Sequence, residues 1–170
     1  IVQQNHGFIN VYSELGHGTT FRIYFPQHQQ QAQESPREES LRQISHGNET
    51  VLLVEDESAI LRLAQTMLER WGYRVLTASK PSEAIQIAQS YPESIHLLIT
   101  DVIMPEMNGR DLTRHIASLR PGMKVLFTSG YTANVIAHHG VLDAGVHFMQ
   151  KPFSMEDLAH KVREALDTVL

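Results

Sequence analysis

The stretch IHLLITDVIMPEMNG, residues 95–109, decides how the rest of the chain is interpreted. It starts as a short apolar run, which is typical of a strand buried on both faces of a parallel sheet. The run ends at the carboxylate Asp101 and passes into a turn segment that closes at Gly109. A single acid after a strand is most often a turn residue, so the meaning of Asp101 depends on the polar residues that end the neighbouring strands.

Similar apolar runs recur along the chain from residue 50 onward. They alternate with segments in which apolar residues return at helical spacing. Such alternation predicts βαβ units with right-handed crossovers, and therefore a parallel sheet within an α/β domain. We predict strands at residues 51–54, 73–77, 95–100, 124–128 and 146–149.

Local signals place the helices between these strands. Gly72 ends the first helix and Pro81 opens the second. Ser154 is expected to cap the last helix, with Asp157 at the capping-box position. The two remaining helices are predicted at about 109–119 and, from a weaker pattern, at about 133–142.

Polar residues stand at the ends of these strands. Glu55 and Asp56 leave the first strand, Asp101 the third, Ser129 the fourth and Lys151 the fifth. Because ligands of open α/β sheets bind beyond the carboxyl ends of the strands, we expect these side chains to gather at one edge. Each alone has an ordinary explanation as a helix cap, a turn residue or a surface lysine, but their joint placement favours a site.

The residue types at this edge suit chemistry at phosphorus. Three neighbouring carboxylates repel one another, and a divalent cation with oxygen ligands, usually Mg²⁺, relieves that repulsion. An Asp carboxylate can act as a nucleophile toward phosphorus, and such reactions depend mainly on positioning and charge neutralisation. A lysine ammonium supplies further charge and a hydroxyl supplies a hydrogen bond. The sequence therefore predicts a metal-dependent phosphoryl-acceptor site.

Four motifs occur in order along residues 50–170: Glu55-Asp56, Asp101 with Pro105 and Gly109, Thr128-Ser129-Gly130 and Lys151-Pro152-Phe153. By these motifs and their spacing the segment resembles the receiver domains of two-component response regulators. The resemblance implies a flavodoxin-like, doubly wound (βα)5 parallel sheet with strand order 2-1-3-4-5. It also implies a phosphorelay in which the acceptor aspartate takes a phosphoryl group from a phosphohistidine.

The same resemblance assigns roles to individual residues. Asp101 is the phosphoacceptor. Asp56 and Asp101 bind Mg²⁺ (or Mn²⁺) directly, together with the backbone carbonyl of Ile103, and Glu55 assists through a water molecule. Lys151 pairs first with the acceptor carboxylate and then with the phosphoryl group.

The resemblance also implies a switch. Ser129 is the switching hydroxyl, with Thr128 as the second choice, and Phe148 occupies the aromatic switch position. Phosphorylation would draw Ser129 toward the phosphate, let Phe148 move inward and reshape the face made by the fourth helix, the fifth strand and the fifth helix. The bond between Lys151 and Pro152 is expected to be cis.

This sequence departs from the family pattern at a few positions. The acidic pair is Glu-Asp rather than Asp-Asp, and the switch hydroxyl is Ser rather than Thr. Ile103 and Tyr131 occupy positions where other members often carry polar groups. We expect these two bulky side chains to hinder an attacking water and to slow self-dephosphorylation.

Residues 1–26 have a different character, with a helix tail ended by Gly7 and strands at 8–13 and 20–25 around a turn at 16–18. They resemble the C-terminal end of a histidine-kinase ATP-binding domain, with GHGTTF as its last glycine box. A plain glycine-rich hairpin is the alternative. The resemblance implies that the chain comes from a longer hybrid sensor kinase. The phosphodonor His and the other ATP-binding boxes are absent, so we expect neither firm ATP binding nor self-phosphorylation from ATP.

The polar, Gln-rich residues 27–49 are predicted to be a linker. Zero Cys excludes disulfide frameworks, and the net charge of −5 argues against a nucleic-acid binder. No apolar run approaches the ~18 residues that span a bilayer and no signal peptide is evident, so a cytoplasmic protein without membrane contact is expected. His138 and His139 are adjacent on a predicted helix and make a poor metal chelate.

The expected partners are a histidine-kinase domain or a histidine phosphotransfer protein. The hairpin is expected either to dock on the receiver domain or to pair with another copy by strand addition, and the second case would give a homodimer. Two other functions stay open. One is a receiver-shaped docking module that is never phosphorylated. The other is a phosphatase of the haloacid-dehalogenase type, which needs a second Asp two residues after the nucleophile, where this chain has Ile103.

Overall fold

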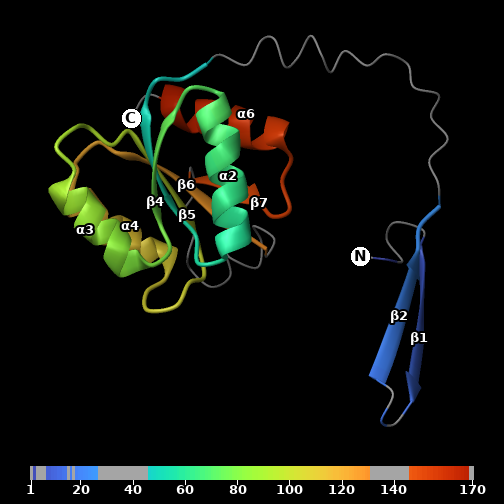
Figure 1. Cartoon of the computed structure of the whole chain (residues 1–170). Helices are drawn as coiled ribbons and strands as arrows, with labels where there is room; N and C mark the ends of the chain where they lie inside the picture. The colour runs from blue at the N-terminus through green and yellow to red at the C-terminus, as the bar shows by residue number, and fades with distance from the viewer. Residues whose placement is uncertain are drawn as a thin grey trace, which may run out of the picture. The chain divides into compact units, whose positions relative to one another are not determined.

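The structure is a computed structural model of the 170-residue chain, and it describes residue 2 and residues 7–14, 16, 18–26, 46–130 and 146–168. The chain divides into two compact units, Ile1–Glu38 and Glu39–Leu170 (Figure 1). Several predictions fall outside the described residues: most of the helix tail before Gly7, most of the linker, the helix at 133–142, and the positions of Tyr131, His138 and His139.

The larger unit is built on a parallel five-stranded sheet in the order β4-β3-β5-β6-β7. Counted within this sheet alone, the order is 2-1-3-4-5, which confirms the predicted flavodoxin-like topology. The strands are β3 (Thr50–Val54), β4 (Arg74–Ala78), β5 (Leu97–Asp101), β6 (Lys124–Ser129) and β7 (His147–Gln150).

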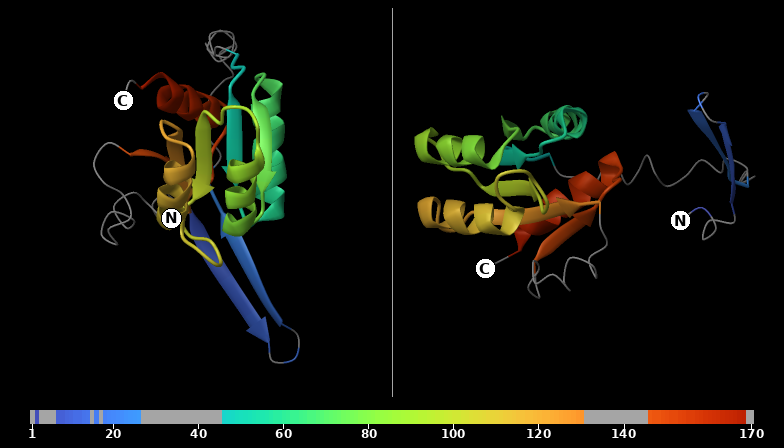
Figure 2. Two further views of the ribbon diagram at one scale, coloured as in Figure 1. Left: turned by 90° about the vertical axis from the view of Figure 1, so that its left-hand side faces the viewer. Right: turned by 90° about the horizontal axis from the view of Figure 1, so that it is seen from below.

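Helices cover both faces of this sheet. α2 (Ser58–Arg70) and α6 (Met155–Asp167) pack on one face. α3 (Pro81–Ser90) and α4 (Gly109–Leu119) lie side by side on the other (Figure 1, Figure 2). Among the described residues, no helix combines the length and the apolar character needed to cross a bilayer.

The side chains of β3 show why the sheet needs helices on both faces. Val51 and Leu53 enter the core beneath α2 and α6, whereas Leu52 and Val54 enter the core beneath α3 and α4. All residues of β3 are buried, because successive side chains of a strand point to opposite faces and both faces are covered. Each of these buried side chains stabilises the fold by about 1.5–3 kcal/mol.

The helix boundaries follow the predicted signals. Ser154 and Asp157 form a reciprocal capping box at the start of α6, as predicted. The Asn108 side chain caps α4 by accepting the Asp111 N–H. Gly72 follows α2 at a φ of +88°, in the left-handed region that glycine adopts without strain. The caps of α4 and α6 fix the loops that follow β5 and β7.

Residues 46–49 pack on the larger unit, although the sequence pattern placed them in the linker. The Gly47 N–H donates to the Trp71 carbonyl at 2.9 Å. The Glu49 carboxylate pairs with Arg163 on α6, with 2.9 Å between Oε1 and Nη1. These contacts fix the entry of the chain into β3, so the folded unit begins by residue 46. Their partners are distant in sequence, which is why composition alone did not reveal them.

The smaller unit is an antiparallel hairpin of β1 (Phe8–Glu14) and β2 (Gly18–Tyr24). Phe8 pairs with Tyr24, and their stacked rings have centroids 4.6 Å apart. β2 begins two residues before the predicted strand, because Ser13 pairs with Thr19 and their hydroxyls hydrogen-bond at 2.8 Å. The large apolar side chains of the hairpin are 44% to 67% exposed, and a two-stranded sheet of this kind is marginal alone in water.

Candidate active site

The register of the parallel sheet brings the predicted site residues to its carboxyl edge. Glu55 and Asp56 come directly after β3, and Lys151 comes directly after β7. Asp101 and Ser129 are the last residues of β5 and β6. The strand pairs that fix this edge are Val54 with Thr100, Asp101 with Thr128, and Ser129 with Gln150.

Lys151 lies between two carboxylates at this edge. Its Nζ is 2.5 Å from Oε2 of Glu55 and 2.6 Å from Oδ2 of Asp101. The three side chains are only 12%, 5% and 14% exposed, respectively. The peptide bond from Lys151 to Pro152 is cis. A buried ammonium thus joins the ends of β3 and β5 to the loop after β7.

Burial and pairing act in opposite directions on the charges of this cluster. Burial raises the pKa of Glu55 above its usual value, although the hydrogen bond from Lys151 acts to lower it. Burial also acts against the charge on Lys151, but the hydrogen bonds to Asp101 and Glu55 outweigh it and raise the pKa of the ammonium. We describe the pair as ionised, because the ammonium at 2.5 Å stabilises the Glu55 carboxylate directly.

The second oxygen of Asp101 is held by the loop that follows it. The Ile103 N–H donates to Oδ1 of Asp101 at 3.1 Å. The Ile103 side chain itself is 58% exposed. Both oxygens of Asp101 therefore have fixed partners, Ile103 on one side and Lys151 on the other. Such a carboxylate is preorganised for reaction rather than free to rotate.

Gly109 lets the loop close tightly over Asp101. Its N–H donates to the Val102 carbonyl at 3.0 Å. A Cβ at Gly109 would lie 2.3 Å from the Asp101 carbonyl oxygen, closer than real Cβ contacts come. The sequence motif gave the spacing of this glycine, and the structure supplies the physical reason, which is close approach of two backbone segments.

Three carboxylates at this edge fit a divalent cation. Oxygens of Glu55, Asp56 and Asp101 lie within 4.8 Å of one another. Asp56 is exposed, whereas Glu55 is buried and Asp101 is half-buried. Hard oxygen ligands of this kind suit Mg²⁺, which keeps several waters and needs an accessible approach. Ile103 stands two residues after Asp101 on the same loop, and a metal contact by its carbonyl stays a prediction.

Both candidate switch hydroxyls lie beside this edge. Thr128 is 4% exposed and Ser129 is 1% exposed. The Ser129 carbonyl accepts the Lys151 N–H at 2.7 Å, and the Thr128 carbonyl accepts the Val102 N–H at 2.9 Å. Ser129 thus sits next to the lysine and Thr128 next to the loop after Asp101.

Phe148 belongs to a small apolar cluster. It pairs with Phe127 in register and packs, half-buried, against the small cluster of Val102 and Phe127. Val102 immediately follows Asp101, so the cluster connects the loop after Asp101 to β7. The structure therefore brings Asp101, Asp56, Glu55 and Lys151 together, while Phe148 joins an apolar cluster.

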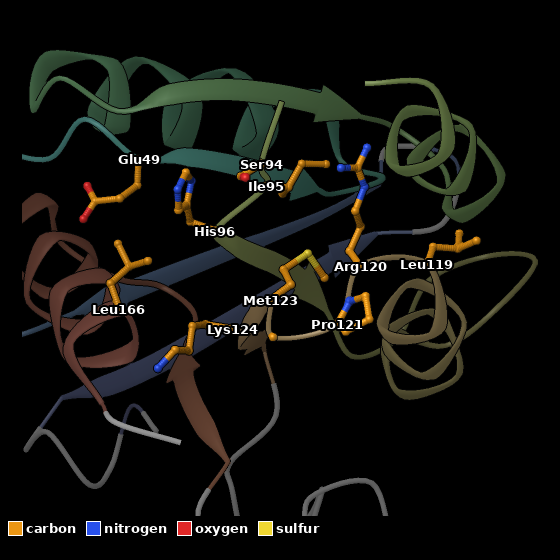
Figure 3. Close-up of a pocket in the computed structure, with 11 residues that line it drawn as sticks. Glu49, Ser94, Ile95, His96, Leu119, Arg120, Pro121, Met123, Lys124 and Leu166 are labelled. Carbon is orange, nitrogen blue, oxygen red and sulfur yellow. The ribbon is translucent and has the colours of Figure 1, made fainter. Parts of the chain in front are cut away.

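A cavity of about 580 Å³ lies at the opposite, amino edge of the sheet (Figure 3). Its cations already serve the fold. The Arg120 guanidinium donates to the carbonyls of Ala88, Tyr91 and Glu93. The Lys124 ammonium donates to the Thr168 carbonyl. We assign the chemistry to the carboxyl edge, because that is where carboxylates gather around a shared cation.

Sequence reasoning missed one contact of the site, the pairing of Glu55 with Lys151. The two residues are 96 positions apart, and strand-end rules predict a shared edge without predicting which side chains touch. The available signal was the glutamate itself. It stands where an aspartate is the alternative, and its extra methylene extends its reach.

The comparisons with known proteins agree with this geometry. Residues 51–163 match the family described as response regulator receiver domain. The sensor kinase CckA of Brucella abortus is 36% identical over 98% of this chain and 18% of its own length. The response regulator receiver protein CpdR of the same organism is 31% identical over 68% of this chain and 95% of its own length.

Solved structures give the same result. The receiver domain of the hybrid histidine kinase CckA has a TM-score of 0.59 and 36% identity, covering 69% of this chain and 99% of that one. The chemotaxis protein CheY4 of Vibrio cholerae has a TM-score of 0.63 and 26% identity, covering 71% and 100%. This chain spans less than a fifth of the sensor kinase but nearly all of the single-domain relatives.

Proposed function

The chain belongs to the response regulator receiver domain family, and on that premise we propose that Asp101 accepts a phosphoryl group from a phosphohistidine in a phosphorelay. One observation carries the proposal: the Lys151 ammonium lies 2.6 Å from an Asp101 carboxylate whose neighbours, Glu55 and Asp56, complete a cluster of oxygens within 4.8 Å. Nucleophile, cation ligands and phosphate-binding ammonium are thus together at one edge.

The proposed reaction is a displacement at phosphorus. A carboxylate oxygen of Asp101 forms the new bond, the bond from phosphorus to the donor imidazole nitrogen breaks, and the imidazole keeps the electron pair and takes up a proton. Mg²⁺ (or Mn²⁺), held by Asp56, Asp101 and the Ile103 carbonyl, would supply charge neutralisation for the phosphoryl oxygens. Lys151 then exchanges its contact with Asp101 for a contact with the phosphoryl group.

The proposed switch follows from the cluster behind the site. The Ser129 hydroxyl would donate to a phosphoryl oxygen, with Thr128 as the alternative donor. Ser129 ends β6, and Phe148 on β7 packs against Phe127 of β6. A shift at the end of β6 therefore has a direct route to Phe148 and to the surface of β7 and α6.

The test is incubation with acetyl phosphate and Mg²⁺ followed by intact mass spectrometry. A gain of ~80 Da, the mass of one phosphoryl group, that disappears in Asp101→Asn is the expected result. No adduct in the wild-type chain would instead favour a docking module. Multiple turnover of a phosphoester would favour a phosphatase, which the Ile103 side chain opposes because it offers no general acid.

We further propose that the chain is part of a hybrid sensor histidine kinase that acts in the cytoplasm. The support is the similarity to CckA, which extends over 98% of this chain and therefore includes the hairpin unit. Residues 1–26 would be the end of the ATP-binding domain, residues 27–45 the linker, and the donor a histidine-kinase domain or a histidine phosphotransfer protein. The net charge of −5 does not favour nucleic acid as a partner.

The exposed hairpin gives this proposal its own test. Within a kinase, its apolar side chains would be covered by the rest of the ATP-binding domain. A longer chain that includes the preceding part of the ATP-binding domain should then protect the hairpin amides from hydrogen exchange. The hairpin should not mediate dimer formation in that longer chain. If the present chain forms dimers that disappear when residues 1–45 are deleted, strand addition between two copies is the better explanation.

A further inference from the structure

The loop between β5 and α4 contains the pair Asn108-Gly109, and no other asparagine of the sequence precedes a glycine. Such a pair is prone to spontaneous deamidation, because glycine has no Cβ to hinder its backbone nitrogen from attacking the asparagine side chain. We propose that Asn108 is a site of spontaneous deamidation and that the folded loop beside Asp101 holds the reaction back, so that modification follows opening of the loop. The site does not depend on the proposed acceptance of a phosphoryl group.

Deamidation of this pair requires only water as a co-reactant. The Gly109 backbone nitrogen forms a bond to Cγ of Asn108 and gives up its proton, while the bond from Cγ to Nδ2 breaks and Nδ2 leaves as ammonia. Water then opens the resulting ring on either side of its nitrogen. Opening at Cγ leaves aspartate at position 108, whereas opening at the backbone carbonyl leaves isoaspartate, which adds a methylene to the main chain. Asn108 is exposed, so water reaches it and ammonia can depart.

The fold holds the side-chain amide of Asn108 in place. Oδ1 accepts the Asp111 backbone N–H at 2.8 Å, and Nδ2 donates to Oδ2 of Asp111 at 2.9 Å. The first of these contacts is the N-terminal cap of α4. Because ring closure must turn Cγ toward Gly109, it breaks both contacts, and the start of α4 loses its cap as the ring forms.

The fold also holds the attacking nitrogen away from Cγ. The Gly109 N–H donates to the Val102 carbonyl at 3.0 Å. Gly109 is buried, and a Cβ on it would lie 2.3 Å from the Asp101 carbonyl oxygen, so the backbone there has no room to shift. The ψ of Asn108 is 159°, an extended backbone that must rotate before the Gly109 nitrogen can reach Cγ. The rate of deamidation should therefore follow the fraction of time that the loop is open.

Either product alters the loop beside Asp101. Aspartate at position 108 keeps an oxygen for the cap, but it replaces the amide that donates to Asp111 with a carboxylate oxygen, and the two acids repel each other. Isoaspartate lengthens the main chain next to Gly109, which has no spare room against the Asp101 carbonyl. If Asp101 is the phosphoacceptor, chains that carry isoaspartate should gain the phosphoryl group at least about fivefold more slowly, because the reacting carboxylate is displaced.

Ageing the whole chain for several weeks at physiological temperature and mildly alkaline pH tests the site. Peptide mass spectrometry follows a gain of about 1 Da, the mass difference between an amide and an acid, and chromatography separates aspartate from isoaspartate. We expect the gain at Asn108 and not at Asn10 or Asn48, which precede Val11 and Glu49. No gain at Asn108 in the folded chain overturns the proposal.

Unfolding the chain in urea tests the control by the fold. With the loop open, deamidation of Asn108 should be at least about tenfold faster than in the folded chain. Rates within about threefold of each other overturn the proposal, because the loop would then not restrain the reaction.

Asp111→Ala tests the hold on the side chain, because it removes the acceptor of Nδ2 and leaves the backbone N–H that Oδ1 binds. Loss of one hydrogen bond should make deamidation of the folded variant about threefold to tenfold faster than in the wild type. Ser118→Ala is the matched control, since it removes a hydrogen bond at the far end of α4 and should leave the rate unchanged. Equal rates in Asp111→Ala and wild type, or equal increases in both variants, overturn the proposal.

If Asp111→Ala does not fold, as judged by circular dichroism, low urea concentrations applied to the wild type decide instead. Deamidation at Asn108 and hydrogen exchange of the Gly109 amide should then rise together by the same factor, since both need an open loop. A rise in exchange without a rise in deamidation overturns the proposal.

Failure of this site differs from failure of the receiver function. If the fresh chain gains a phosphoryl group and the aged chain shows no deamidation at Asn108, only the modification site is wrong. If the aged chain is deamidated at Asn108 and the fresh chain gains no phosphoryl group, only the phosphorelay is wrong.

Discussion

The two edges of the parallel sheet both gather cations, but they satisfy them in different ways. At the amino edge, Arg120 donates to three backbone carbonyls and so ties loops together. At the carboxyl edge, Lys151 lies between Glu55 and Asp101, with Asp56 as a further acid nearby. Backbone carbonyls carry no net charge and are not nucleophiles, whereas carboxylates can balance the charge of a metal ion or accept a phosphoryl group. The nature of the partner, more than the presence of a cation, distinguishes the two edges. We call the amino edge the structural edge and the carboxyl edge, where phosphorylation is proposed, the reactive edge.

The largest expected effect comes from removing the cation of the reactive edge. Lys151→Met leaves Glu55 and Asp101 as neighbouring, largely buried carboxylates. We expect the metal-free domain to lose about 3 kcal/mol of unfolding free energy, since breaking a buried pair strands its partner. Millimolar Mg²⁺ should restore part of that loss by binding the folded state. Urea unfolding with and without Mg²⁺ measures the loss of unfolding free energy and its recovery. An equal loss under the two conditions would contradict the view that these carboxylates can exchange the lysine for a metal ion.

A smaller loss of stability is expected at Gly109, where two backbone segments of the carboxyl edge approach closely. Gly109→Ala places a Cβ against the Asp101 carbonyl and should cost about 2 kcal/mol of stability while slowing phosphorylation by acetyl phosphate. Gly122→Ala is the matched control, because no atom lies near its Cβ position and its penalty comes only from a φ of +84°. The control should be less stable without any change in phosphorylation rate. Slower phosphorylation in both variants would argue against a local role for Gly109.

The structural edge can be disturbed separately. Arg120→Met removes the donors to the Ala88, Tyr91 and Glu93 carbonyls. The expected cost is about 2 kcal/mol, in the range for hydrogen bonds made by a charged group. At a temperature where the variant is folded, its rate of phosphorylation should stay within about twofold of the wild-type rate. The amino edge makes no contact with the reacting groups, so the activation barrier should not change. A larger change in rate would mean that the two edges are coupled.

A milder change concerns water access to the reactive edge. The exposed Ile103 side chain stands beside the Asp101 carboxylate that its own N–H binds. Ile103→Asn should shorten the acyl-phosphate lifetime by about threefold to tenfold, roughly 0.7–1.4 kcal/mol in barrier height. The lifetime is followed by loss of the phosphorylated mass over time. An unchanged lifetime would remove Ile103 as the group that hinders water.

The smallest effect is expected at the Glu49–Arg163 ion pair of the amino edge. Burial acts to raise the pKa of Glu49, but the hydrogen bond from Arg163, the backbone hydrogen bonds and the charge of Arg163 together outweigh it and lower the pKa below the usual 4.5. A lowered pKa in the folded state gives stability that is present above the unfolded pKa and disappears as the pH falls through the folded one. Glu49→Gln should therefore cost about 0.5–1 kcal/mol at pH 7 and progressively less below about pH 4.5. Chemical unfolding of the wild type and of Glu49→Gln at pH 7 and below about pH 4.5 measures the difference in unfolding free energy. A difference that grows on acidification would contradict the prediction.

Much of this molecule was predictable because its signals are local. The alternating cores under β3 come from residues 51–54, whose apolar run permits no exposed face. The capping box of Ser154 and Asp157 lies within four residues and was predicted directly. The gathering of Glu55, Asp101 and Lys151 followed from the rule that parallel strands share a carboxyl edge.

The parts that could not be predicted depend on contacts between distant residues. The Lys151 ammonium contacts both Glu55 and Asp101 because its side chain reaches across three strand spacings. No rule based on sequence spacing predicts these contacts. Residues 46–49 have a linker-like composition, and their place in the fold is fixed by Trp71 and Arg163. Thr128 and Ser129 are both buried at the strand end, so position alone does not decide which hydroxyl would take the proposed switching role.

The anchored segment at residues 46–49 has a practical consequence for how the domain can be handled. It meets the sheet at the amino edge, so the length of β3, about 16 Å for a five-residue strand, separates the attachment point from Glu55 and from the carboxyl edge. Residues 46–49 themselves therefore lie away from the carboxyl edge. A fluorescent reporter or a surface tether joined ahead of residue 46 should accordingly leave access to Asp101 unhindered.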